Sequence, residues 1–142
     1  MKRFAVRVLL VLLAASCGIG WAATDGGYVV STFVGGIPPR TPVAAREASI
    51  GHITGMAVDA AGAVYLSSSL HCVFKIDRKG VLSRVAGTCR AGYSGDGGPA
   101  VDAQLKQPKG LAVDRFGALY IAAMGSNVVR KVSAKGVITT VA

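Results

Sequence analysis

Short apolar runs, separated by polar turn residues, recur through residues 55–142. In the first half of this region the runs cover residues 56–58, 63–67, 73–76 and 81–86. Two of the connections, 59–62 and 77–80, begin with Asp and end with Gly. Asp bonds its own backbone and Gly accepts a positive φ, so both connections predict tight turns between strands. Because the runs are apolar at nearly every position, we expect both faces of each strand to be covered.

The same order of runs and turns returns about 55 residues later in the chain. The matched segments are GMAVD (55–59) with GLAVD (110–114), GAVYL (62–66) with GALYI (117–121), and GVLSRVA (80–86) with GVITTVA (136–142). The links before the two units also match, since 44–50 aligns with 99–105. We expect each link to form about one turn of helix. This many ordered matches establish an internal repeat.

Each repeat predicts four short antiparallel strands, which is the size of one β-propeller blade. The predicted fold class is all-β, with two four-stranded blade units and an orphan strand at 29–34 that resembles the fourth strand of a unit. The predicted divisions are a leader, an N-terminal strand and linker, blade 1, a Gly/Pro-rich linker and blade 2, at residues 1–22, 23–54, 55–87, 88–109 and 110–142. The orphan strand has no three-stranded blade to complete, so we expect a partial propeller from an incomplete chain.

Three motifs of the second unit resemble the NHL repeat, namely GLAVD (110–114), GALYIA (117–122) and NVVRKV (127–132). The loop GYSGDGGPA (92–100) is similar to a signature of secreted bacterial NHL-repeat proteins. The resemblance implies blades of a six-bladed type of propeller. It implies no single activity, because NHL proteins include binding scaffolds, RNA-binding domains and a few lyase- or lactonase-like enzymes. The first unit departs from the pattern, with LHC (70–72) where the second has the Asn turn GSN (125–127).

The first 22 residues have the layout of an export signal. A basic start is followed by an apolar run at 8–15 and by small residues, with a cleavage site after Ala22. As an alternative, AASC (14–17) resembles a lipobox, which would leave a lipoprotein anchored at Cys17. A retained membrane anchor is disfavoured, because the apolar stretch is shorter than the roughly 20 residues of a spanning helix. All three alternatives place the protein outside the cytoplasm, either secreted or periplasmic.

Charge and composition limit both the class of protein and the kinds of ligand that it can bind. The net charge is +9, and three of the positive charges lie in the leader, which leaves +6. Charged residues make up 16% of the chain, and this low share excludes a disordered chain and a coiled coil. Export disfavours nucleic acid, so we expect an unknown protein or glycan ligand. We expect contact with a membrane only through an uncleaved leader or a lipidated Cys17. The open blade faces predict self-association.

No group of residues has the spacing of a catalytic, cofactor or metal site, and the sequence predicts none of the three. His52 and His71 stand alone, without the neighbouring ligands that zinc requires. Asp59 and Asp114 occupy equivalent turn positions, and turn formation explains both. Asp96, within SGDGG, lacks the several acids of a calcium loop and is interpreted as part of a structural loop.

Cys72 and Cys89 leave two alternatives open. In an oxidising compartment the two can form a disulfide. If Ile76 pairs with Val81, however, Cys89 falls opposite Ser68 and not opposite Cys72. That register favours buried or free thiols, unless the chain bends back after the strand.

The function that we expect is that of an exported, non-enzymatic scaffold for binding or structure. The alternative is a fragment of a propeller enzyme, a lyase or a lactonase, whose catalytic residues lie on other blades. The enzyme hypothesis requires His and acidic residues that project from several strand ends, and the scaffold hypothesis does not.

Overall fold

The computed structural model describes residues 38–142. The leader, Cys17 and the orphan strand predicted at 29–34 lie outside the described residues. No helix among residues 38–142 is long and apolar enough to cross a membrane.

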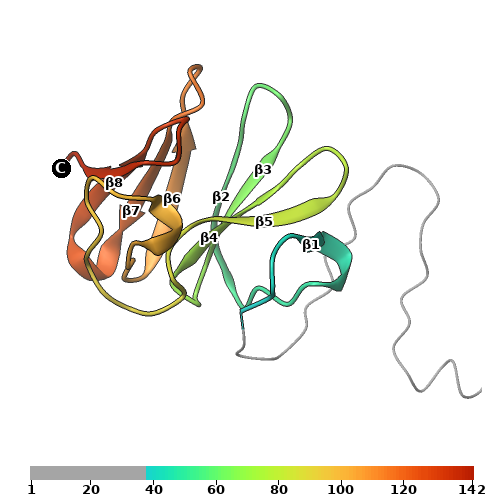
Figure 1. Ribbon diagram of the computed structural model, residues 1–142, viewed down its shortest axis with the longest axis horizontal. Coiled ribbons are helices and arrows are strands. Elements are labelled where there is room, and N and C mark those ends of the chain that lie inside the picture. The colour runs from blue at the N-terminus through green and yellow to red at the C-terminus, as the bar shows by residue number, and fades with distance from the viewer. Residues whose placement is uncertain (1–37) are drawn as a thin grey trace, which may run out of the picture. The chain divides into compact units, whose positions relative to one another are not determined.

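The first repeat forms one antiparallel sheet (Figure 1). Its strands are β2 (Ile53–Val58), β3 (Val64–Ser68), β4 (Cys72–Ile76) and β5 (Val81–Ala86), each paired with the next along the chain. This confirms the four predicted strands. A fifth strand that the sequence analysis missed, β1 (Val43–Ala44), pairs with the outer edge of β5.

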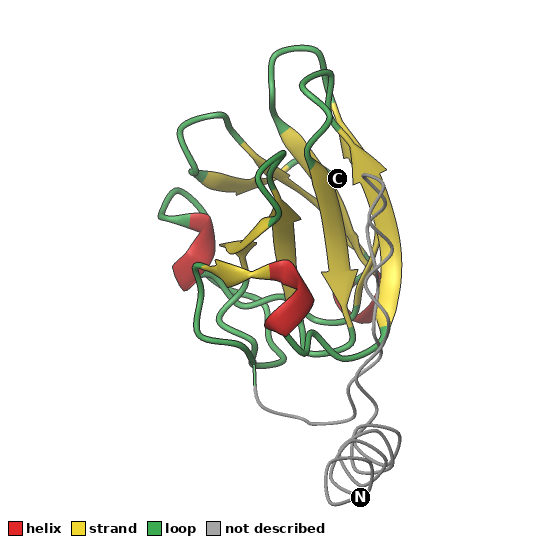
Figure 2. Ribbon diagram, turned by 90° about the vertical axis from the view of Figure 1, so that its right-hand side faces the viewer, coloured by secondary structure: helices red, strands yellow, loops and turns green. Residues whose placement is uncertain are grey.

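The second repeat forms a separate four-stranded antiparallel sheet in the order β6-β7-β8-β9. Its strands are β6 (Pro108–Val113), β7 (Leu119–Ala123), β8 (Val128–Val132) and β9 (Ile138–Thr140). The helical elements of the described chain are single 3-10 turns, η1 (Ala45–Glu47), η2 (Ala100–Asp102) and η3 (Met124–Ser126) (Figure 2). The predicted all-β fold and the predicted helical turn in each link are confirmed. We call the two sheets blade 1 and blade 2.

The turn chemistry predicted at the Asp–Gly connections is present. Asp59 accepts a hydrogen bond from Ala63 N at 2.8 Å, and Asp77 accepts one from Val81 N at 2.9 Å. Asp114 repeats the arrangement of Asp59 in blade 2, accepting from Ala118 N at 2.9 Å. Because each carboxylate bonds the far side of its own turn, it fixes the loop that joins two neighbouring strands.

The link between the blades forms part of their shared core. Ala100, Ala103 and Leu105 are fully buried in one apolar cluster with residues of both sheets. Blade 1 contributes Tyr65, Val73 and Ala86 to this cluster, and blade 2 contributes Leu119, Ile121, Val132 and Ile138. Beside the cluster the first strands of the two blades, β2 and β6, contact each other. The link therefore fills the space between two sheets that neither could cover alone.

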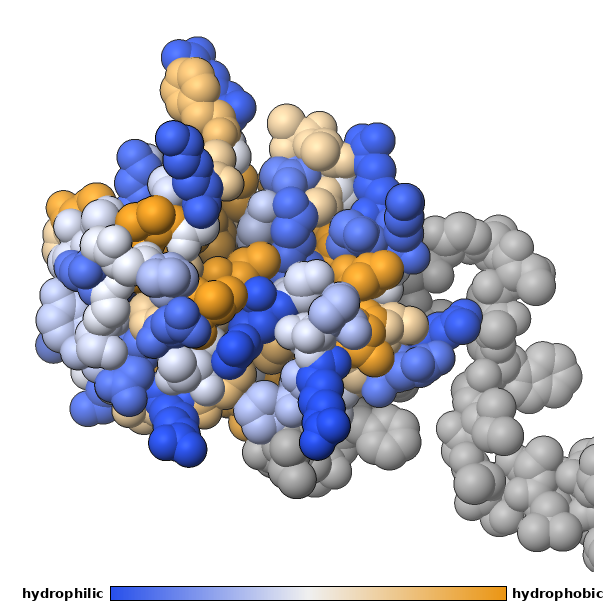
Figure 3. Space-filling view, in the orientation of Figure 1, coloured by the Kyte–Doolittle hydropathy of each residue, from blue (hydrophilic) through white to orange (hydrophobic). Residues whose placement is uncertain are grey.

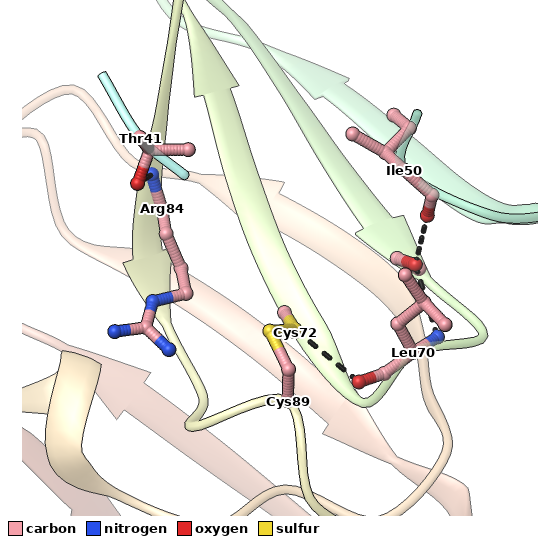
Figure 4. The surroundings of a disulfide bond; sticks show 7 residues. Thr41, Ile50, Leu70, Cys72, Arg84 and Cys89 are labelled. Carbon is pink, nitrogen blue, oxygen red and sulfur yellow. Dashed lines mark hydrogen bonds between the residues drawn. A yellow bond between two sulfur atoms is a disulfide. The ribbon is translucent and has the colours of Figure 1, made fainter. Parts of the chain in front are cut away.

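Cys72 and Cys89 form a disulfide, so the register argument that favoured free thiols is wrong (Figure 4). Ile76 pairs with Leu82 and not with Val81, and a bulge shifts the pairing again near the start of β4. Gly87, at φ 89°, then turns the chain back. The two cysteine Cα atoms come within 4.9 Å, which is a normal separation for a bridged pair.

A prediction concerns the closest approach of the two blades, which occurs at Gly55. A Cβ atom added to Gly55 would overlap with the carbonyl oxygen of Lys109. We expect Gly55→Ala to lower the free energy of unfolding by about 1–3 kcal/mol, the usual cost of forcing extra atoms into a packed site. Urea denaturation followed by circular dichroism measures this change.

The matched control is Gly110→Ala, at the equivalent position of blade 2. There an added Cβ would meet Ala122 Cβ at 3.5 Å, an ordinary contact. We expect no loss of stability, and a gain of up to about 1 kcal/mol from the lower backbone entropy of the unfolded chain. Equal losses in the two variants would show that the blades do not pack through β2 and β6 as described.

Candidate functional site

A polar hollow of about 230 Å³ lies where the two blades meet. Its lining residues are Thr54, Ser69, His71, Gln107, Pro108 and Lys109. They come from the beginnings of β2 and β6, from the turn between β3 and β4, and from the end of the link. Both blades and the link are therefore needed to form it.

Hydrogen bonds between the blades hold this hollow in shape. Gln107 N donates to His71 Nδ1 at 3.1 Å, and Thr54 Oγ1 donates to the carbonyl oxygen of Pro108 at 2.6 Å. Just beneath, the buried Ser67 hydroxyl donates to the carbonyl oxygen of Lys109 at 2.6 Å. His71 and Gln107 both have positive φ, at 63° and 49°, a conformation that side chains rarely adopt. The cross-blade contacts fix both residues in place.

Three residues of the lining, His71, Ser69 and Lys109, can donate hydrogen bonds to a ligand. Because His71 Nδ1 accepts from a backbone N–H, the neutral ring carries its proton on Nε2 and can donate from there. Ser69 Oγ already accepts from His52 N at 3.1 Å, which leaves its hydroxyl hydrogen available. Lys109 is exposed and adds an ammonium group. A ligand that fits these groups offers acceptor oxygens or a negative charge.

The sequence analysis singled out two of the residues near this hollow, His52 and His71, and considered them only as metal ligands. The structure places His71 in the lining and His52 next to it through the Ser69 bond. Within residues 38–142 no three His, Cys, Asp or Glu side chains lie close enough to hold a metal ion. The hollow was missed because its residues come from three separate segments. One signal was available, since His71 takes the left-handed position that Asn127 takes in blade 2.

A second polar cluster surrounds Arg130, which is fully buried in β8. Its guanidinium forms an ion pair with Asp96 and donates to the carbonyl oxygen of Ser94 at 3.1 Å. The Tyr93 ring lies 5.0 Å from the guanidinium carbon. Hydrogen bonds from Thr140 and the positive charge of Arg130 lower the pKa of Asp96, against an opposing effect of desolvation. Asp96 thus belongs to a structural loop, as predicted, with a buried partner that was not predicted.

Blade 1 has two uncharged residues in place of this ion pair. Phe74, also fully buried, occupies the position of Arg130, and Thr41 occupies the position of Asp96. The backbone bond is kept, because Thr41 Oγ1 accepts from Arg84 N at 3.3 Å just as Asp96 accepts from Thr140 N at 3.1 Å. The two loops therefore keep the same backbone hydrogen bond, while the buried side chain beside each loop differs between the blades.

The turn carboxylates Asp59 and Asp114 lie in equivalent clusters in the two blades. Asp59 accepts from Ala63 N and lies 3.6 Å from Lys75 Nζ, and these contacts lower its pKa, the backbone bond most strongly. The pKa of Lys75 is raised, first by its interaction with Tyr65 and then by Asp59. In blade 2 the pKa of Asp114 is likewise lowered by backbone N–H groups, with Ala118 the first of them. These groups stabilise turns and are not free for chemistry.

Residues 89–142 match the Teneurin NHL domain family. The matched segment covers blade 2 and most of the link before it. Mouse teneurin-3 is 46% identical over 46 residues, covering 32% of this chain, and human teneurin-4 is 37% identical over 93 residues, covering 56% of it. The chain spans 2% and 3% of the length of these two relatives. The expected secreted bacterial type stays a prediction.

Solved structures similar to this chain include a streptogramin B lyase, with 16% sequence identity and a TM-score of 0.49. The match covers 72% of this chain and 28% of that protein. A virginiamycin B lyase from Staphylococcus aureus has 13% identity and a TM-score of 0.48, with 70% and 29% of the two chains covered.

A prediction follows from the different residue pairs at these equivalent positions, Asp96 with Arg130 and Thr41 with Phe74. Asp96→Thr leaves Arg130 buried without its carboxylate, and breaking such a pair costs about 3–5 kcal/mol when both partners are buried. Because the Asp96 side chain is 46% exposed, we expect a smaller loss of about 2 kcal/mol. Guanidinium denaturation measures the change in the free energy of unfolding.

The double variant Asp96→Thr/Arg130→Phe copies the Thr41–Phe74 pair of blade 1 into blade 2. We expect it to be more stable than Asp96→Thr alone, because replacing a buried ion pair by well-packed apolar groups is often neutral. If the double variant were the less stable of the two, the proposed equivalence of the two loops would be wrong.

Proposed function

We propose that this chain is an exported, non-enzymatic binding module of the NHL-repeat type, whose ligand contacts the polar hollow between the blades. The observation that carries the proposal is the hollow's set of donors, His71, Ser69 and Lys109, of which His71 is held by the link through Gln107 N and Ser69 by His52 N. A site that is formed before its ligand arrives loses little entropy on binding, which favours recognition.

The state of the carboxylates supports a binding function over an enzymatic one. A general base acts best when its pKa lies near the pH of the reaction. The pKa values of Asp59, Asp96 and Asp114 are all lowered, because each carboxylate accepts bonds from backbone N–H groups or cations. Carboxylates held in this way are weak bases, so these three support the scaffold hypothesis over the lyase or lactonase alternative.

The ligand that best fits the hollow carries carboxylate or other acceptor oxygens, on a protein or on a glycan. Its charge would complement Lys109 and the net positive charge of the chain. Export is supported by the layout of the first 22 residues and by the Cys72–Cys89 disulfide, since disulfides persist in oxidising compartments.

A binding assay tests this proposal. The purified chain is immobilised and exposed to polygalacturonate, to poly-glutamate and to neutral dextran. We expect at least one of the two anionic probes to bind and dextran not to bind. His71→Ala/Lys109→Ala should weaken binding about thirtyfold, since two hydrogen bonds of about 1 kcal/mol each contribute about 2 kcal/mol together. Preference for one anionic probe separates a glycan ligand from a protein ligand.

The matched control is Lys135→Ala, which removes one positive charge from an exposed position in the turn between β8 and β9, outside the hollow lining. We expect this control to bind as the unmodified protein does. An equal loss of binding in the control, or no binding of either anionic probe, would contradict the assignment of the hollow. Chemical conversion of a probe would favour the enzyme alternative.

A further inference from the structure

The interface between the two blades has two unlike halves. Blade 1 presents Tyr65, Val73 and Ala86 on the side that faces blade 2, and all three are buried. The other half consists of the link residues Ala100, Ala103 and Leu105 together with the facing side of blade 2. Each half therefore buries apolar surface that the other half would expose if it stood alone.

The first of these halves recurs on blade 2. Tyr120, Val129 and Ala142 hold the repeat positions of Tyr65, Val73 and Ala86, but they are half-buried or exposed. We call the side of blade 2 that carries Tyr120, Ala122, Val129 and Ala142 its trailing face. A hollow of about 280 Å³ lies there, lined by Ala122, Ala123, Met124, Asn127, Val128, Val129 and Ala142. In blade 1 the equivalent region packs against Leu105, which is fully buried.

The second half recurs on blade 1 and its link. Ala45, Ala48 and Ile50 hold the positions of Ala100, Ala103 and Leu105, yet they are half-buried where those are fully buried.

Two strand residues complete this surface. Met56 and Val58 in β2 hold the positions of Leu111 and Val113, which pack against the core between the blades. Met56 is 65% exposed and Val58 is 57% exposed. We call the side of blade 1 with Ala45, Ala48, Ile50, Met56 and Val58 its leading face. In Figure 3 apolar side chains reach the surface near the middle of the molecule, among projecting polar loops.

We propose that the trailing face of one molecule binds the leading face of a second copy of this chain, and so repeats the internal interface between molecules. The partner is identified by repeat equivalence. The trailing face is equivalent to the side of blade 1 that packs against the link and blade 2 inside the molecule. The leading face is equivalent to the link and the side of blade 2 that pack against blade 1. The two faces differ, so the contact is head-to-tail and leaves one free face at each end of a dimer. Such a contact closes into a ring when the rotation per copy allows it. Two, three or four copies give four, six or eight blades, within the range of known propellers.

The first measurement is the mass of the full chain by light scattering over a range of concentrations. We expect masses of two or more copies that dissociate on dilution. Met56→Asp alters only the leading face, and Ala122→Asp alters only the trailing face. Each single variant should be a monomer, because a charged side chain in either face blocks every head-to-tail contact. Circular dichroism checks that both variants keep the all-β spectrum.

Mixing the two variants is the decisive experiment. Each variant retains the face that the other lacks, so an equimolar mixture should form a one-to-one dimer and nothing larger. Phe116→Asp is the matched control, because Phe116 is 73% exposed in the turn between β6 and β7 and lies on neither face. We expect this control to keep the unmodified mass.

Three results would overturn the proposal. The first is a monomeric unmodified chain at every concentration, which would leave the faces to another occupant such as the chain's own residues 29–34. The second is a mixture that stays monomeric. The third is a loss of association in Phe116→Asp equal to that in Met56→Asp, which would indicate non-specific hydrophobic contact.

Discussion

The structure depends on one constraint, which is that a short apolar sheet needs cover on both of its faces. Blade 1 meets this need on one side through the link residues Ala100, Ala103 and Leu105, which bury themselves against both blades. Ala100 and Ala103 are small, because a backbone that runs between two sheets leaves little room for side chains, and Leu105 fills the remaining apolar space. The link also bonds to each side, through Gly87 N to Ala100 O at 2.9 Å and through Ala100 N to Gly136 O at 2.8 Å. The polar hollow follows from this packing, since the end of the link brings Gln107 to His71.

The two repeats show which parts of the architecture are fixed and which are free to vary. The turn carboxylates Asp59 and Asp114 have the same bonds in both blades, because the strand connections need them. The buried position in the third strand of each blade varies: Arg130 in β8 pairs with Asp96, whereas Phe74 in β4 has Thr41 at the matching loop position, and the backbone bond is kept. An ion pair and an aromatic ring thus fill one site at similar volume, as expected where shape matters more than polarity.

Much of the fold could be predicted from the sequence, because its signals are local. Apolar runs of strand length and Asp–Gly turns repeat in order, and the four strands of each blade lie where those runs predict them. Contacts that depend on register could not be predicted in the same way. A shifted hairpin register, a bulge and the turn of the chain at Gly87 together brought Cys89 next to Cys72, against the expectation from simple hairpin pairing. The hollow was equally hidden, since Thr54, His71 and Lys109 meet only after the two blades have packed.

The central claim is that the link makes the two blades one cooperative unit, and hydrogen exchange of Leu105→Ala tests it most directly. Leu105 is fully buried between the blades, so we expect protection in β4 and in β7 to fall together, by about 2–5 kcal/mol. Ile50→Ala, at the equivalent but half-buried position of the first link, should cost less. Loss of protection in one blade with the other unchanged would show that each sheet folds by itself, and would contradict the account.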